Sequence, residues 1–215
     1  MMAYGHLLGN PDINMILDTI NEMHNNRDMP PSCHGRYHAM FVVDTIEHIL
    51  KLFSCDSRTI ELGKIAALSH DIGNIAGRRN HARKSAALAG VFLDGLCDLS
   101  HEEKDIIIQA IADHSDGHAI SSAVGAALII ADKVDLSKRR ILPVETLDAW
   151  HRNLLEIEDV DIYVSGQTIV VNYTTTNAFS QEVYLSDCRV LGLLTRAASY
   201  FGCNFKFNWS VFPTS

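Results

Sequence analysis

Apolar residues recur at helical spacing through most of the chain, which predicts a series of amphipathic helices. Asn10-Pro11-Asp12 has the form of a helix start, and Ile13, Leu17 and Ile20 follow it on one face. Ser100-His101-Glu102-Glu103 has the form of a capping box, so another helix begins there. By the same reasoning the chain forms further helices over residues 36–53, 57–70, 81–97, 100–114, 121–135 and 144–156.

After residue 159 the apolar pattern changes from helical to alternating. Val160, Ile162 and Val164 alternate with polar residues, and Ser165-Gly166 offers a turn before the β-branched segment 168–174, so a hairpin is expected. A helix over 180–201 and a strictly alternating segment over 203–211, typical of a half-buried antiparallel strand, complete the pattern. The sequence therefore predicts a mainly α protein, with a helical bundle over residues 1–156 and a small ββαβ (α+β) subdomain over 157–215.

Composition narrows the class of protein. The chain has 215 residues, of which 47% are hydrophobic and 20% charged, as expected for a folded globular protein. Its net charge of -8 disfavours a nucleic acid polymer or an anionic membrane as partner, because both attract basic surfaces. The 5 cysteines are scattered and odd in number, which favours reduced thiols, and no stretch resembles a secretion signal or membrane span. We therefore expect a cytoplasmic protein.

The most informative stretch is 66–74, where an apolar helix ends in His70 and Asp71 side by side and Gly73 lets the backbone turn away. Inward-facing positions of other predicted helices carry three more residues of the ligand type, namely His38, His114 and Asp132. An unpaired carboxylate buried at Asp132 would cost roughly several kcal/mol, so it needs a cation or hydrogen-bond donors.

One histidine on an apolar helix face is usually a hydrogen-bonded core residue. Here, however, five histidine and aspartate residues lie on inward faces or ends of four helices, which is the arrangement that a metal site in a bundle core requires. Imidazole and carboxylate together suit Fe, Mn, Zn, Ni or Co better than Ca, with Mg as a further option. The sequence therefore predicts a buried site for divalent metal ions.

The spaced set His38, His70-Asp71 and Asp132, the last within Ala131-Asp132-Lys133, resembles the H…HD…D signature of the HD-domain superfamily of metal-dependent phosphohydrolases. The similarity covers roughly residues 30–140 and includes Arg36-Tyr37-His38. It implies an all-helical core in which the four signature residues hold one metal ion. The expected activity is hydrolysis of a phosphomonoester or phosphodiester in a nucleotide or another small phosphorylated compound.

The resemblance also implies a second metal ion. His81 and His114 fall where two-metal members of the superfamily carry extra histidines, and Asp71 would bridge the two ions. Two cations about 3.5–4 Å apart can lower the pKa of a bridging water toward about 7 and neutralise charge on a phosphoryl group. Lys84, Lys133 and Arg36 are the first choices for orienting the remaining phosphates. The second choices are Arg78, Arg79, Arg139 and Arg140.

One branch of the superfamily is disfavoured, because the chain lacks the Gly-Tyr-Pro segment after His114 that marks the cyclic-dinucleotide phosphodiesterases. Two other classes of function remain open. A di-iron oxygenase, as in the myo-inositol oxygenase branch of the same superfamily, would use a very similar set of ligands. A non-catalytic module that senses a nucleotide or binds a partner is the third reading, although such a module would not need six ligands.

The remaining aromatic and histidine residues carry weaker expectations. His118 and His34 are undecided between a surface position and a role in the site. A surface position is expected for His6, His24, His48, His101 and His151. The apolar stripe of Phe205, Phe207 and Trp209 must be covered by the tail helix or by a second subunit, so a homodimer is one expectation.

Overall fold

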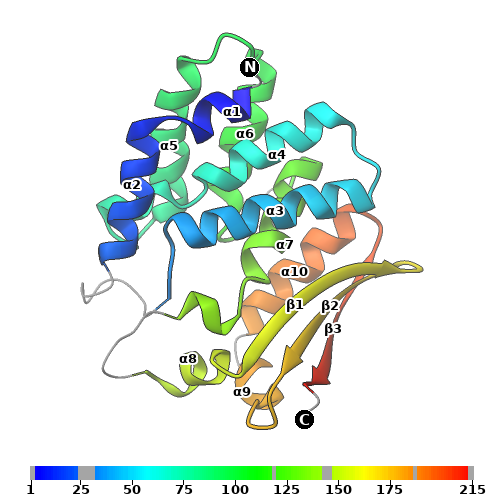
Figure 1. The fold of residues 1–215 in the computed structure, drawn as a ribbon. Helices are drawn as coiled ribbons and strands as arrows, with labels where there is room; N and C mark the ends of the chain where they lie inside the picture. Colours follow the sequence, from blue (N-terminus) through cyan, green and yellow to red (C-terminus); the bar gives the residue numbers. More distant parts are fainter. Residues whose placement is uncertain (1–2, 24–31, 118–119, 142–146, 186–187, 213–215) are drawn as a thin grey trace.

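The structure, a computed structural model, describes residues 3–23, 32–117, 120–141, 147–185 and 188–212 of the chain. A helical bundle comes first, and Figure 1 shows a three-stranded sheet along one side of it. The helical part consists of α1 (Ala3–Leu8), α2 (Pro11–Glu22), α3 (Arg36–Leu52), α4 (Ser57–Ser69), η2 (Ile72–Ala76), α5 (His81–Asp94), α6 (His101–Asp113), α7 (Ala123–Lys133), η3 (Lys138–Arg140) and α8 (Ala149–Leu154). The C-terminal part consists of β1 (Ile157–Ser165), β2 (Thr168–Thr175), α9 (Gln181–Leu185), α10 (Cys188–Tyr200) and β3 (Asn204–Val211). The prediction of a mainly α chain with a small C-terminal α+β part is confirmed.

Helix α7 lies at the centre of the bundle. Its residues from Val124 to Asp132 are all buried, and it packs against α3, α4, α6 and α10. A helix that is apolar nearly all round can only be stable when other elements cover every side of it. The central position of α7 therefore places Asp132, near its C-terminal end, inside the protein.

Two predicted helix starts are confirmed by their side-chain hydrogen bonds. The Asn10 side chain accepts a hydrogen bond from the Asp12 main-chain N–H at 2.9 Å, and Pro11 is the first residue of α2. At the start of α6, the Ser100 hydroxyl accepts from the Glu103 N–H while the Glu103 carboxylate accepts from the Ser100 N–H, which completes the capping box.

Glu103 also joins α6 to α4, and this pair gives a first testable prediction. The Arg58 guanidinium, 2.5 Å and 2.8 Å from the two carboxylate oxygens, lowers the pKa of Glu103 from 4.5 to about 2. A carboxyl with a lowered pKa in the folded state stabilises the protein above pH 4.5 and loses this effect as the pH falls toward 2. Glu103→Gln should therefore lower the free energy of unfolding at pH 7 by about 1 kcal/mol, a value discounted because Arg58 is partly exposed.

Urea unfolding at pH 7 and pH 3 measures this effect. The difference in free energy of unfolding between wild type and Glu103→Gln should narrow at pH 3, because Glu103 is then largely protonated in the unfolded chain, and the ionised carboxyl of the folded state stabilises it less. Asp105→Asn, at an exposed aspartate of the same helix, is the matched control. If Glu103→Gln lowers the free energy of unfolding equally at pH 7 and pH 3, the ion pair between Glu103 and Arg58 does not stabilise the fold in this way.

Some predicted helices differ in length from those observed. Helix α5 ends at Asp94 instead of residue 97, because the chain turns at Gly95, and α1 was not predicted. The helix expected over 144–156 is reduced to α8, which begins after the capping side chain of Asp148, and its predicted start at Val144 lies outside the described residues. The helix expected over 180–201 is described as two helices, α9 and α10, on either side of residues 186–187.

The hairpin of the tail is confirmed, whereas the direction of the last strand was predicted wrongly. β1 pairs antiparallel with β2, and Gly166 in the connecting turn has a φ of +59°. β3 pairs parallel with β2, in the order β1-β2-β3. Because α10 carries the chain back along the sheet before β3 begins, the two strands that it connects run in the same direction.

Helix α10 packs between the sheet and the bundle, where Leu193, Leu194, Ala197 and Ala198 are buried (Figure 1). The Tyr173 hydroxyl of β2 donates a hydrogen bond to the main-chain oxygen of Val134 at 3.2 Å, so the sheet also contacts the end of α7. The apolar core is consequently continuous from the helices into the sheet. Among the described residues, no helix is both long and apolar enough to cross a membrane.

Candidate metal centre

The His70-Asp71 pair is positioned by the end of α4 and the turn that follows. His70 caps α4, and its Nδ1 lies 2.7 Å from the main-chain oxygen of Ala67, which no longer has a partner in the helix. Behind the pair, a Cβ added at Gly73 would lie 2.3 Å from the main-chain nitrogen of Ser85. Glycine is thus required here by the close approach of α5, whereas the sequence suggested a turn away from the helix.

Three histidines are oriented in the same way. The Nδ1 of His70 donates to a main-chain oxygen, the Nδ1 of His114 donates to the main-chain oxygen of Ile111 at 2.7 Å, and the Nδ1 of His38 donates to the Asp135 carboxylate at 2.6 Å. A neutral imidazole that donates from Nδ1 carries a free lone pair on Nε2. This arrangement of partners behind the ring is typical of histidines that bind metals.

The first group of donor atoms comes from α3, the end of α4 and α7. His38 Nε2 lies 3.2 Å from His70 Nε2 and 3.3 Å from Asp132 Oδ1. Asp71 Oδ2 lies 3.7 Å from the His38 nitrogen and 3.6 Å from the His70 nitrogen. All four side chains are buried. These are the four residues of the predicted signature, and the structure brings them together.

The second group lies on the other side of Asp71. His81, the first residue of α5, and His114, which follows α6, face each other with their Nε2 atoms 3.2 Å apart. Asp71 Oδ1 lies 3.4 Å from His81 Nε2 and 3.8 Å from His114 Nε2. The Asp71 carboxylate therefore directs one oxygen toward each pair of imidazoles.

The two groups have the spacing and the unmet charge that suit a cation. Two nitrogens bound to one ion at about 2.0–2.1 Å, with bond angles of about 90–110°, lie about 2.8–3.4 Å apart. When both rings are neutral and donate from Nδ1, the Nε2 lone pairs of His38 and His70 face each other at 3.2 Å, and a cation between them would stabilise this arrangement. Asp71 Oδ1 is buried and has no hydrogen-bond partner in the described part of the chain. The residues present thus fit divalent metal ions.

Three of the four imidazoles of the cluster are held neutral, as a metal ligand requires. Burial lowers the pKa of His81 to about 4 and lowers the pKa of His70 and of His114 as well. His38 differs, because burial acts to lower its pKa but the hydrogen bonds to Asp132 and Asp135 outweigh burial and leave the pKa raised.

The two carboxylates of the cluster are held ionised. Burial acts to raise the pKa of Asp71, but the neighbouring His70 and His34 outweigh it and lower this pKa well below its usual range. For Asp132, burial is outweighed in the same way by Lys133 and His38. Two buried negative charges beside neutral imidazoles are the electrostatic environment in which a cation is stabilised.

The structure does not bring two of the predicted basic residues into this cluster. The Arg36 guanidinium binds Asp18 on α2, with distances of 2.6 Å and 2.8 Å to its two oxygens. The Lys84 ammonium donates to the main-chain oxygens of Ala76 and Gly77, at 2.6 Å and 3.1 Å. Both side chains therefore hold helices and turns together.

Other basic residues do approach the cluster. Lys133 Nζ lies 2.6 Å from Asp132 Oδ2, as its place in the sequence suggested. Arg78 Nη1 lies 3.6 Å from Asp71 Oδ1 and donates to the Asn74 side chain at 3.2 Å. Arg140 is buried beside His34, while Arg139 pairs with Asp159. Arg79 is exposed.

His34 and Asp135 are site residues that the sequence reasoning did not assign. His34 is buried with Nδ1 3.0 Å from Asp71 Oδ2, and Asp135 binds His38 as described above. His118 and His24 lie outside the described residues. His6, His48 and His101 are exposed as predicted, although His48 donates to the Ile162 main-chain oxygen of β1 at 2.7 Å. His151 is half-buried and pairs with Asp148 at 2.9 Å.

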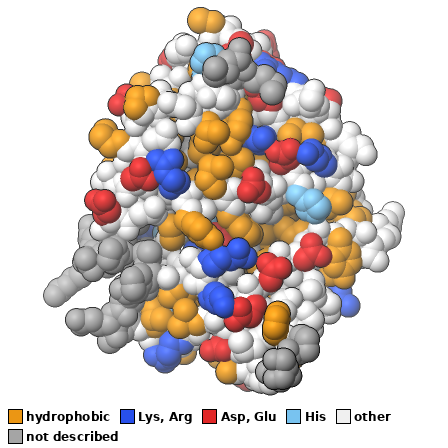
Figure 2. Space-filling model, viewed as in Figure 1, with side chains coloured by type: hydrophobic (Ala, Val, Ile, Leu, Met, Phe, Trp, Pro, Cys, Tyr) orange, Lys and Arg blue, Asp and Glu red, His pale blue; other side chains and the backbone are white. Residues whose placement is uncertain are grey.

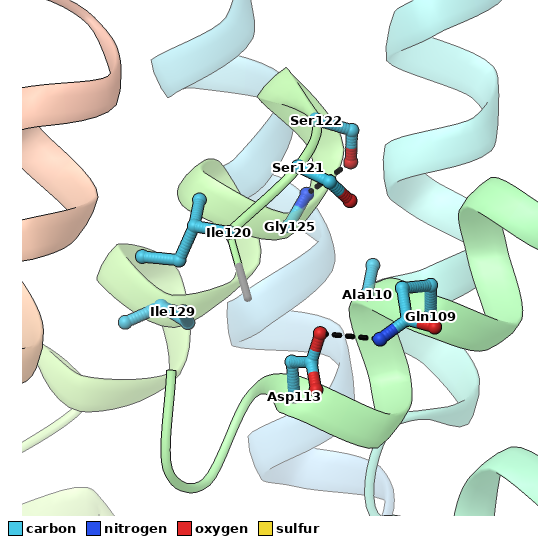
Figure 3. Close-up of a pocket in the computed structure, with 8 residues that line it drawn as sticks. All are labelled: Gln109, Ala110, Asp113, Ile120, Ser121, Ser122, Gly125 and Ile129. Carbon is cyan, nitrogen blue, oxygen red and sulfur yellow. Dashed lines mark hydrogen bonds between the residues drawn. The ribbon is translucent and has the colours of Figure 1, made fainter. Parts of the chain in front are cut away.

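Two further cavities lie apart from this cluster. The pocket in Figure 3, between the end of α6 and the start of α7, measures about 10 Å³ and has room for about one water molecule. Gln109 and Asp113 are hydrogen-bonded to each other at its edge. A larger cavity of about 450 Å³ is lined by Asn21, Arg36, Tyr37, Met40, Phe41, Asp44 and Arg139.

Surface charge on the face seen in Figure 2 is mixed. Basic and acidic side chains are interspersed around a patch of hydrophobic ones, and no continuous basic surface is visible among the side chains drawn in colour. A nucleic acid polymer binds through an extended basic surface.

The fold and the cluster together define a mainly helical protein with buried histidine and aspartate residues that could bind metal ions. No protein-family model matches the chain, and no curated protein matches it. Among solved structures, the chain is similar to one described as a predicted HD superfamily hydrolase from an uncultured Thermotogales bacterium. The identity is 24% and the TM-score 0.44, over 64% of this chain and 75% of that chain. At this level the likeness supports no step of the chemistry, which depends on the side chains described above.

Proposed function

We propose that the chain is a metal-dependent phosphohydrolase with two adjacent metal positions. The observation that carries the proposal is the Asp71 carboxylate, whose two oxygens face two separate pairs of imidazoles inside the protein. A carboxylate placed in this way is suited to bridge two cations. Two adjacent cations are the arrangement that phosphatases and nucleases use for displacement at phosphorus.

The ligands divide into two sets that share Asp71. One position would be held by His38, His70, Asp71 and Asp132, and the other by Asp71, His81 and His114. Ions at these positions would supply Lewis acidity, lowering the pKa of a water molecule and offsetting the negative charge of a phosphoryl group. The set with only three protein ligands leaves more of its coordination open to substrate.

Lys133 and Arg78 are the basic residues that we assign to the substrate. Each lies beside one carboxylate of the cluster and is still partly exposed, with 17% of the Lys133 side chain and 33% of the Arg78 side chain accessible. A basic side chain in this position can contact a carboxylate ligand and also reach a phosphate oxygen of a substrate that enters from solvent. Lys133 was a first choice from the sequence, whereas Arg78 takes the place of Arg36 and Lys84, whose donors are engaged elsewhere.

A panel of small phosphoesters tests the proposal. Purified protein should release phosphate from at least one nucleotide or other small phosphorylated compound when Mn²⁺, Ni²⁺ or Co²⁺ is supplied, and chelation should stop the release. His101→Ala, at an exposed histidine, should retain full activity. Metal content measured on the same samples shows whether both positions are filled.

Three outcomes would overturn this function. Oxygen uptake with Fe²⁺ and no phosphate release would favour the oxygenase, which suits the same donor set. Nucleotide binding without turnover across the panel would favour the sensing module. Phosphate release that does not depend on any metal would also contradict the proposal, because the cluster would then have no part in the reaction.

The expected partner remains a small phosphorylated substrate, with no membrane or nucleic acid polymer. Within the chain, the stripe of Phe205, Phe207 and Trp209 packs against the apolar core, and the Trp209 and Tyr173 rings stack with their centroids 5.1 Å apart. The tail helix and sheet thus cover much of this stripe themselves. The homodimer stays a prediction, for which light scattering is the direct measurement.

A further inference from the structure

His34 lies in the loop before α3 and touches the carboxylate that joins the two groups of ligands. Its ring is buried, with Nδ1 3.0 Å from Asp71 Oδ2 and Nε2 3.4 Å from the Ser32 hydroxyl. No position in either set of proposed ligands is assigned to it. Its contact is with the same carboxylate oxygen that faces His38 and His70.

The hydrogen-bond chemistry determines how His34 acts on Asp71. Asp71 Oδ2 can only accept and the Arg140 guanidinium can only donate, and both lie within hydrogen-bond distance of His34 Nδ1. We assign the ring proton to Nδ1, where it donates to the buried Asp71 carboxylate. The neutral ring then has a bare Nε2, which can accept from the Ser32 hydroxyl. With its proton on Nδ1, the nitrogen nearest to the cluster is a donor and offers no lone pair to a metal ion.

Arg140 holds the His34 loop in place. Its guanidinium is buried in η3, with Nε donating to the Cys33 main-chain oxygen at 3.2 Å and Nη1 donating to the Asp135 main-chain oxygen at 2.8 Å. In return, the Cys33 main-chain N–H donates to the Arg140 oxygen at 2.7 Å. The third nitrogen, Nη2, lies 3.1 Å from His34 Nδ1, at hydrogen-bond distance from the same atom that contacts Asp71 Oδ2.

We propose that His34 is a positioning residue for Asp71, and that Arg140 acts through His34 by fixing the loop that carries it. The inference rests on the metal centre proposed above. A carboxylate that bridges two pairs of imidazoles must not rotate, and the hydrogen bond to Oδ2 fixes the rotation that leaves Oδ1 toward His81 and His114. Partners behind metal ligands typically contribute about 10–100-fold to metal affinity.

Mn²⁺ affinity, measured by electron paramagnetic resonance of free Mn²⁺ at fixed pH, tests His34. His34→Ala should weaken Mn²⁺ binding by about 10–100-fold. His34→Asn should stay within about threefold of wild type, because its amide nitrogen takes nearly the place of Nδ1 and can still donate. Thermal unfolding of the metal-free variants shows that the fold is retained.

A double variant tests the role of Arg140. Arg140→Gln should weaken Mn²⁺ binding, and adding it to His34→Ala should weaken binding little further, because both changes remove the same support. The matched control is Lys138→Gln, which removes an exposed cation of η3 that pairs with Glu158 and should leave affinity unchanged. If Arg140→Gln does not fold, His34→Ala and His34→Asn alone test the positioning role of His34.

The possible failures can be told apart. If wild type binds no Mn²⁺, the proposed function fails, and this inference fails with it. If wild type binds Mn²⁺ and His34→Ala binds it equally well, only the positioning role is overturned. If His34→Asn loses as much affinity as His34→Ala, His34 acts as a ligand and the positioning role is again overturned.

Discussion

Asp71→Asn is expected to remove metal from both positions and to lower phosphate release by at least about a thousandfold. The amide has nearly the shape of the carboxylate but lacks its charge, and one of its two terminal atoms is a donor that would face an imidazole pair. Cation stabilisation of charge at phosphorus contributes several kcal/mol, and about 4 kcal/mol corresponds to a thousandfold in rate.

Two measurements separate this effect from a loss of folding. Metal content should fall from about two ions per chain in wild type to nearly none, as expected for a bridging ligand. Mn²⁺ should raise the midpoint of thermal unfolding of wild type but not of Asp71→Asn, since only a bound ligand stabilises the folded state. Asp105→Asn, at an exposed aspartate, should behave as wild type. A variant that keeps its metal and its rate would show that Asp71 bridges nothing.

Four of the six proposed ligands could be found in the sequence because helical periodicity fixes where their side chains point, whereas the place of His81 and the bridging role of Asp71 were implied by the family resemblance. His38 and Asp132 share a face with buried apolar residues, and His70 and His114 follow directly after stripes of the same kind. The two histidines that cap helices then turn inward through the same contact, from Nδ1 to a main-chain oxygen three residues earlier. Helical periodicity and the contacts at helix ends were therefore enough to predict that these four side chains point inward.

The basic residues were harder to place, because proximity in sequence does not determine direction. Arg36 precedes His38 by two residues, which is a rotation of about 200° around a helix, so the two side chains point to nearly opposite sides. Arg36 accordingly meets α2. Lys84 lies on the same face as His81, but its long side chain reaches back to the free oxygens of η2.

His34 and the direction of β3 depend on contacts between distant segments. His34 lies in a loop without periodicity, and its position is set by Arg140, 106 residues away in the sequence. The alternation in the last strand shows which side faces the core but not the direction of pairing. The preceding helix was the better indicator, because a helix that connects two neighbouring strands favours a parallel pair.

His81→Ala is expected to separate the two metal positions. The variant should bind about one ion per chain instead of two, because the remaining set of His38, His70, Asp71 and Asp132 keeps all of its donors. Of the proposed ligands, His81 is the most exposed, with 11% of its side chain accessible. Its removal should therefore disturb the folded state less than the loss of a fully buried ring.

Phosphate release should fall by at least about a hundredfold in His81→Ala, since one of two charges that stabilise the phosphoryl group is lost. His38→Ala, made in parallel, should lose the ion on the other side of Asp71 and should also free the Asp135 carboxylate from its partner at 2.6 Å. Elemental analysis and single-turnover rates on the same samples give both quantities. If wild type holds only about one ion and His81→Ala keeps it with an unchanged rate, the second position does not exist, and the chemistry depends on the His38 set alone.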